Sequence, residues 1–294
     1  MAVHKDHTVQ LGAASGIATL DSSTKVVQDP ASAQTTAAAS KIPISGTNSE
    51  IAAGFRPWDP DFCSGCKLTR LSATQVRIET GKCRDDSDTQ NITVSSTLTV
   101  DIAAATGDGG LDTGSEAAST WYYVWVIRKS SDGTLGRLLS ISSTAPTMPS
   151  GFDQKRRLGC VYNNASSNFI NWRMTLLDGG RMRQYDYDES AATKQVLATG
   201  AATTFTNINL SASPNPGAMP PTSELPIINA NTNNTIAANI REDGFATSNG
   251  WGVSTNSRGA NRVVMQAPAQ IIEYQMAAGS GSLDVYVMGF IEII

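Results

Sequence analysis

The residues whose chemistry depends most on spacing are four cysteines, at Cys63, Cys66, Cys83 and Cys160. Cys63-Ser-Gly-Cys66 has the two-residue spacing of redox pairs and zinc sites. Two prolines precede it, however, where a redox pair would follow a strand, and Cys83 and Cys160 are 77 positions apart, unlike a second zinc-binding pair. We therefore expect a tight turn with small buried thiols, no metal and no cofactor. A disulfide formed in an oxidising medium remains an open alternative.

A second motif, Leu111-Asp-Thr-Gly-Ser115, has the form of a turn that presents one carboxylate of a proton-sharing pair in acid proteases. The pair needs two such turns, and this sequence contains one. The motif also follows the glycine-rich stretch Gly107–Gly110, which favours a loop between two strands. We expect Asp112 to have no catalytic role.

Two acidic clusters complete the candidates. Asp85-Asp86-Ser87-Asp88 starts like a calcium loop but lacks the glycine and glutamate that the loop requires, so a solvated turn is favoured. Asp186, Asp188 and Glu189 are too close in sequence to bracket a sugar. The two histidines, His4 and His7, both lie at the N-terminus, which disfavours a histidine base in a folded pocket. We predict that the protein is not an enzyme.

Composition narrows the function classes further. The 294 residues carry 22 basic and 26 acidic side chains, a net charge of −4, and only 16% of residues are charged. A nucleic-acid-binding protein normally has a basic face, so we expect no nucleic-acid partner. The N-terminal residues lack the apolar region of a signal peptide, and no stretch approaches about 20 apolar residues, so we expect no membrane insertion.

The positioning elements are predicted to be strands. Asn91–Ile102 alternates apolar and polar residues throughout, which indicates a half-buried strand. Trp121–Ile127 is apolar on both faces and is predicted to be a central strand, returning as a hairpin through Leu135–Ile141. Its aromatic residues could form a sugar-binding platform, but core packing is favoured. Ala31–Lys41 has the composition of one or two helical turns.

Short strands with turn signals between them continue toward the C-terminus and favour a β-sandwich or jelly roll. They are predicted at Thr204–Leu210, Thr235–Ile240, Trp251–Thr255, Ile271–Met276 and Leu283–Ile294, around a proline-rich loop at Ser211–Pro226. In the last strand we expect Leu283, Val285 and Val287 to face the core. Tyr286, Met288 and Phe290 are expected to face a neighbouring subunit, most simply in a homotrimer.

We predict a mainly β protein of three parts. Residues 1–54 lack aromatic residues and arginine and are expected to form an extended arm, because they cannot bury enough apolar surface to order themselves. Residues 55–190 are expected to form a β-rich domain, and residues 191–294 a C-terminal β-sandwich domain.

The arm carries a resemblance. Leu11–Leu20 followed by Asp21-Ser-Ser-Thr-Lys-Val-Val27 resembles a repeat of bacteriophage fibre N-termini, and Lys41–Gly54 is a looser second copy. The sequence departs from that repeat at Thr24 and Val27, where glycine and proline are usual. Gly110–Trp125 and Ser142–Phe152 are similar to phage fibre-associated proteins. Residues 191–294 carry no such resemblance.

The resemblance implies a structural protein of the virion, made in the host cytoplasm. It would be a short trimeric fibre or spike, anchored to other phage structural proteins of the capsid or tail by its arm, with host-surface glycan as a candidate receptor. A capsid head fibre or decoration protein without a receptor is the alternative, and a polysaccharide depolymerase is a more remote one. The candidate attachment residues are Leu11, Ile17, Leu20, Val26, Ile42 and Ile44.

Overall fold

The computed structural model describes residues 33–34, 42–43, 61–211, 219–232, 236–245, 250–253 and 262–294. The chain divides into two compact units, Met1–Asp59 and Pro60–Ile294. The mainly β fold is confirmed, because 51% of residues are in strands and 3% in helices. The jelly-roll arrangement and the boundary near residue 190 stay predictions.

In the first unit, the described residues are β1 (Ala33–Gln34) and β2 (Ile42–Pro43), which pair in parallel. Ala33 and Gln34 are thus extended where helical turns were expected, because their partners are Ile42 and Pro43. Of the candidate attachment residues, Ile42 lies in β2. The other five lie outside the described residues, namely Leu11, Ile17, Leu20, Val26 and Ile44.

Three antiparallel three-stranded sheets form the first part of the second unit. The first, in the order β3-β6-β7, contains β3 (Cys63–Gly65), β6 (Gly81–Arg84) and β7 (Asn91–Val94). The second, in the order β4-β5-β8, contains β4 (Leu68–Arg70), β5 (Gln75–Ile78) and β8 (Leu98–Asp101). The third, in the order β10-β9-β11, contains β9 (Thr120–Arg128), β10 (Leu135–Ser140) and β11 (Gln154–Asn163).

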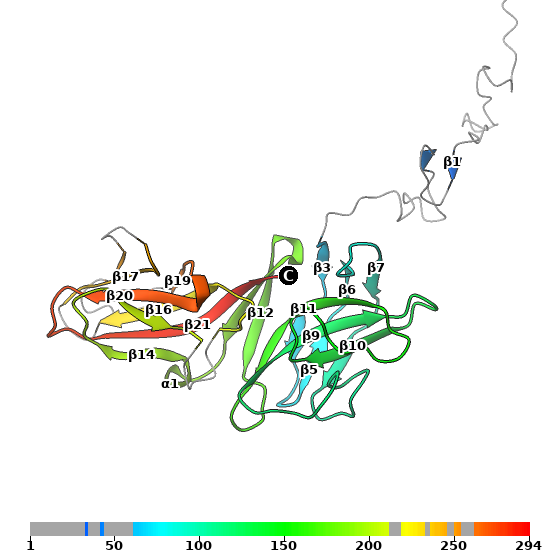
Figure 1. Ribbon diagram of the computed structural model, residues 1–294, viewed down its shortest axis with the longest axis horizontal. Helices are drawn as coiled ribbons and strands as arrows, with labels where there is room; N and C mark the ends of the chain where they lie inside the picture. The colour runs from blue at the N-terminus through cyan, green and yellow to red at the C-terminus, as the bar shows by residue number, and fades with distance from the viewer. Residues whose placement is uncertain are drawn as a thin grey trace, which may run out of the picture. The chain divides into compact units, whose positions relative to one another are not determined.

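Two larger sheets follow (Figure 1). The six-stranded sheet contains β12 (Trp172–Leu177), β13 (Met182–Tyr187), β14 (Gln195–Gly200), β16 (Leu225–Thr232), β19 (Arg262–Val264) and β21 (Leu283–Ile293). The four-stranded sheet contains β15 (Thr206–Asn209), β17 (Ala238–Glu242), β18 (Trp251–Val253) and β20 (Ile271–Met276). The helical elements described are α1 (Ala191–Lys194) and 3-10 turns at Asp178–Gly180 and Pro268–Gln270.

The aromatic strand is placed as predicted. β9 is the centre of its sheet, and β10 returns beside it as a hairpin. The predicted continuous strand over Asn91–Ile102 is wrong, because the chain leaves one sheet after Val94 and enters another at Leu98. The polar residues between them, 95–97, make the crossover. Alternation continues across the break, which is why both halves still bury their apolar face.

The longest strand described, β21, pairs with different strands along its two halves. Its first half pairs with β14 and β16, and its second half pairs with β13 and β16 (Figure 1, red). The register slips by one residue where Ile227 and Ile228 face Gly289 and Val287, so Met288 is an extra residue. A bulge of this kind reverses which side of the sheet the following residues face.

The bulge corrects the expected orientation of Phe290. Phe290 is fully buried, as are Leu283, Val285 and Val287, and it stacks on Tyr185 with ring centroids 4.4 Å apart. It therefore lies inside the chain's own core, while Tyr286 and Met288 are half-buried on the opposite face. Gly289 permits the close approach, since a Cβ there would lie 1.8 Å from the Tyr185 carbonyl oxygen.

Replacing Phe290 tests this register. Phe290→Ala should lower the free energy of unfolding by about 3–5 kcal/mol, because it empties a buried aromatic site. Met288→Ala, on the opposite face, should cost about 1 kcal/mol or less. Urea unfolding of both variants measures the difference. Equal small losses would show that Phe290 does not lie in the core.

Candidate functional site

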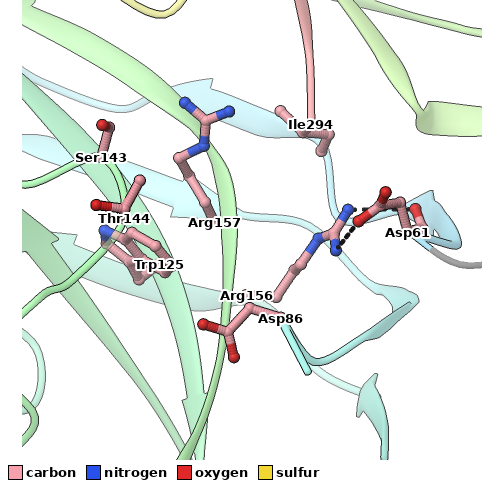
Figure 2. Close-up of a pocket in the computed structure, with 8 residues that line it drawn as sticks. All are labelled: Asp61, Asp86, Trp125, Ser143, Thr144, Arg156, Arg157 and Ile294. Carbon is pink, nitrogen blue, oxygen red and sulfur yellow. Dashed lines mark hydrogen bonds and ion pairs between the residues drawn. The ribbon is translucent and has the colours of Figure 1, made fainter. Parts of the chain in front are cut away.

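A pocket of about 290 Å³ opens beside β11 and the end of β21. Its lining residues are Asp61, Asp86, Trp125, Ser143, Thr144, Arg156, Arg157 and Ile294 (Figure 2). β11 supplies two consecutive arginines, and β9 supplies the tryptophan opposite Arg157 in the ladder. The pocket is thus built by segments that lie far apart in the sequence but meet at one strand.

Arg156 holds the start of the second unit. Its guanidinium donates from Nη1 to Asp61 Oδ1 at 2.9 Å and from Nη2 to the Asp61 carbonyl oxygen at 3.2 Å (Figure 2, dashed lines). The Arg156 side chain is 5% exposed, so this pair is more than a surface ion pair. Asp86 is also paired, with Lys155 at 2.5 Å.

Arg157 is held by a buried carboxylate. Its Nη1 donates to Glu292 Oε1 at 2.9 Å, and the Glu292 side chain is fully buried. Glu292 also accepts hydrogen bonds from Thr222 Oγ1 at 2.8 Å and Cys160 Sγ at 3.5 Å. A buried carboxylate with three donors is compensated, whereas removal of one donor would leave charge without adequate solvation. Burial beside this network raises the pKa of Tyr123 to about 12.

Recognition rather than proton transfer fits this donor set. The pocket's Arg156 and Asp61 are paired, and the buried Trp125 Nε1 lacks a hydrogen-bond partner among the described residues. Figure 2 shows the Arg157 guanidinium lying between the Ser143–Thr144 segment and Ile294. The Arg157 guanidinium and the Ser143 and Thr144 hydroxyl groups in the pocket lining can hydrogen-bond to a polar ligand's hydroxyl or carbonyl groups.

The motif carboxylates have hydrogen-bonding or ion-pair partners within the chain. Asp112 accepts hydrogen bonds from Ser140 Oγ at 2.7 Å and the Thr147 backbone at 2.8 Å, tying its loop to β10 and the segment beyond. Asp186 forms an ion pair with Arg262. Asp85 is 3% exposed, so the expected solvated turn is wrong at this residue. Its carboxylate accepts the Thr89 and Gln90 backbone N–H groups at 2.9 Å and 2.7 Å and closes the turn between β6 and β7.

The expectation of small buried thiols is confirmed, but the expected tight turn is wrong at Cys63–Gly65, which forms strand β3. All four cysteines are buried and free, and Gly65 and Cys66 have φ values of 75° and 50°. No group of three or more His, Cys, Asp or Glu side chains in the described residues is arranged to hold a metal ion. Among these residues, no helix has the length and apolar character needed to cross a membrane.

The sequence analysis missed both pocket arginines. Lys155-Arg156-Arg157 is a run of three basic residues in a chain with few charges, and this was the available signal. Their partners are 95 and 135 residues away, so sequence spacing does not reveal the pairing. Trp125 was correctly expected in the core, yet it also lines the pocket.

The Asp85 turn carries a pH-dependent prediction. Burial raises the pKa of this carboxyl, but hydrogen bonds from Ser87, Gln90 and Thr89 outweigh it and hold the pKa below the usual 3.8. A depressed folded-state pKa stabilises the fold above pH 3.8, and the contribution disappears as the pH falls through the folded value.

Asp85→Asn should therefore lower stability by about 1–3 kcal/mol at pH 7, with the difference shrinking in acid. Urea unfolding at pH 7 and pH 3 measures it. Asp86→Asn, which removes a more exposed ion pair, is the matched control and should cost about 1 kcal/mol or less. A loss for Asp85→Asn that does not change with pH would contradict the assignment.

Comparison with known proteins adds no relative to this description. No family model, no curated protein and no solved structure matches the chain.

Proposed function

We propose that the chain is a structural protein of a bacteriophage virion, a short trimeric fibre or spike attached through residues 1–54. Three features support the proposal. The N-terminal repeat over Leu11–Val27 resembles phage fibre segments, only 16% of residues are charged, and the body is built of open antiparallel sheets. The alternative of the same class is a capsid head fibre or decoration protein without a receptor.

The observation that carries the assembly part of the proposal is the outer face of the six-stranded sheet. In the ladder, Ile227 of β16 lies opposite Val264 of β19 and Gly289 of β21. These three residues face away from the core, whereas the neighbouring pair Ile228 and Val287 faces the core. The same outer face continues through Tyr286, Met288, Ile291 and Ile293. On this face Ile227 and Ile291 are already buried within the chain, whereas Val264 and Ile293 are 49% and 62% exposed. Apolar side chains gathered on one sheet face favour a protein partner, and in a homo-oligomer that partner is another copy.

A catalytic role, including that of a polysaccharide depolymerase, has less support. The carboxylates that could act as acid or base, Asp112 and Asp186, have hydrogen-bonding or ion-pair partners that position loops and strands. The pocket beside β11 instead offers donors that suit the hydroxyl groups of a glycan. Contact with host glycan therefore belongs to this proposal as a receptor role, with the pocket as its candidate site.

Sedimentation tests the assembly. The protein should sediment as a trimer at micromolar concentration, because the outer sheet face is buried between copies. Val264→Asp combined with Ile293→Asp should shift it toward monomer, since charges desolvated at that face are unfavourable. Ile141→Asp, at a side chain 66% exposed outside this sheet, is the control and should leave the trimer intact. A stable monomer of the unaltered protein would overturn the trimer.

Electron microscopy tests attachment and placement. Gold-labelled antibody fragments against residues 61–294 should bind virions, and a chain lacking residues 1–54 should fold yet fail to join particles. Label at the tail end supports a receptor role, whereas label over the capsid supports decoration. Virions without label, or particles that incorporate the shortened chain normally, would overturn the proposed attachment.

A further inference from the structure

Arg183 is a fully buried arginine that donates hydrogen bonds to a carbonyl oxygen and to sulfur atoms. Its side chain extends from β13 and is 0% exposed. Nη1 donates to the Cys66 carbonyl oxygen at 2.8 Å, and Nη2 donates to Cys63 Sγ at 3.2 Å. Among the described residues, no carboxylate forms an ion pair with it. A buried guanidinium without a counter-charge is strongly unfavourable, and Glu292, which lies opposite Arg183 in the ladder, pairs with Arg157. The thiolate form of Cys63 is therefore the group in hydrogen-bond contact that can compensate the guanidinium.

Two further thiols surround the same sulfur. Cys66 and Cys83 interact electrostatically with Cys63 and with each other. Interactions with these thiols and with Arg183 lower the pKa of Cys63, while interactions with Cys63 and Cys66, followed by burial, raise the pKa of Cys83. These opposite directions favour a thiolate at Cys63 beside protonated thiols at Cys66 and Cys83.

The backbone brings one of these pairs within disulfide range. Cys63 and Cys83 lie directly opposite each other in β3 and β6. The Arg84 N–H donates to the Phe62 carbonyl oxygen at 2.8 Å, which makes Phe62–Arg84 the hydrogen-bonded pair and Cys63–Cys83 the non-hydrogen-bonded pair next to it. Such pairs have Cα atoms about 4.5 Å apart, and disulfides form at about 4.4–6.8 Å.

We propose that Cys63 and Cys83 are a thiol–disulfide site in which Arg183 holds the Cys63 sulfur, with a small-molecule disulfide as the oxidant. The Cys63 thiolate attacks the oxidant and releases one thiolate, giving a mixed disulfide. Cys83 then loses its proton, attacks the Cys63 sulfur and releases the second small thiol. Two cysteine sulfurs are oxidised by two electrons in total, and the oxidant is reduced to two thiols.

Both the location and the charge of the site fit this chemistry. β3 has three residues and forms one edge of its sheet, so access to the buried Cys63 sulfur requires this short strand and the Asp61 contacts with Arg156 and Asp88 to open. A metal ion is disfavoured, because the positive charge of Arg183 is already next to the sulfur. Since Arg183 stabilises the reduced thiolate, the disulfide should be unusually easy to reduce again.

Peptide mapping of the full chain tests the site. The native protein is incubated with oxidised glutathione, alkylated and digested. We expect two of the four thiols to disappear and a peptide linking Cys63 to Cys83. Cys66→Ser and Cys160→Ser should still form this link, whereas Cys83→Ser should stop at a glutathione adduct on Cys63. A native protein that keeps all four thiols, while urea-unfolded protein reacts, would overturn the proposal, as would a link through Cys66 or Cys160.

A redox titration tests the role of Arg183. In buffers of oxidised and reduced glutathione, the Arg183→Met variant should form the disulfide at a lower ratio of oxidised to reduced glutathione than the unaltered protein. The ratio should fall about tenfold for each unit by which Arg183 lowers the pKa of Cys63. An unchanged ratio would remove Arg183 from the site. If that variant does not fold, the mapping of the unaltered protein and its cysteine variants still decides the pairing.

Discussion

The bulge at Met288 is the constraint on which the packing of the second unit depends. β21 pairs with β14, β13 and β16 along eleven residues, and the extra residue reverses its facing halfway along. Both halves therefore bury residues on the same side, with Val285 and Val287 before the bulge and Phe290 and Glu292 after it. Without the extra residue, Phe290 would point outward and leave the Tyr185 ring without its stacking partner.

Two of the few charged side chains in the core lie side by side on neighbouring strands. Glu292 and Arg183 occupy one register position on neighbouring strands, yet each turns to a different partner. Glu292 is paired with Arg157, and Arg183 with the Cys63 sulfur. An unpaired buried charge is unfavourable, so each of these two contacts favours the position of the strand that carries the partner. These pairs connect β11 and β3 to the six-stranded sheet.

Local pattern was sufficient for the strands that alternate without interruption. β20 and the first half of β21 follow directly from apolar periodicity, because their burial repeats every second residue. β9 was predicted instead from an apolar run that is buried on both faces, and β10 from its return as a hairpin. β16 was missed because Pro226 suggested that the proline-rich loop continued, although a proline is tolerated at this position in the ladder beside Phe290. The bulge was missed as well, since one glycine in an apolar strand is a weak signal.

The site was less predictable than the fold. Ion pairs that join residues 95 and 135 positions apart follow from tertiary packing, which no short window of sequence contains. The thiols were predicted to be buried, and they are, but the contact of Cys63 is with Arg183, which lies 120 residues later in the sequence. Residue type predicted burial in these cases, and the topology determined the partner.

The clamp of Arg156 on Asp61 has a mechanical consequence. Tension applied along residues 1–59 reaches the second unit at Asp61, where the backbone N–H also donates to Asp88 Oδ1 at 3.0 Å. The two Arg156 contacts pass that tension into β11, which is paired with β9 along its length. Force is then borne by a long hydrogen-bonded ladder as well as by the short edge strand β3. A pulled chain would have to break this anchorage before β3 could be peeled away one hydrogen bond at a time.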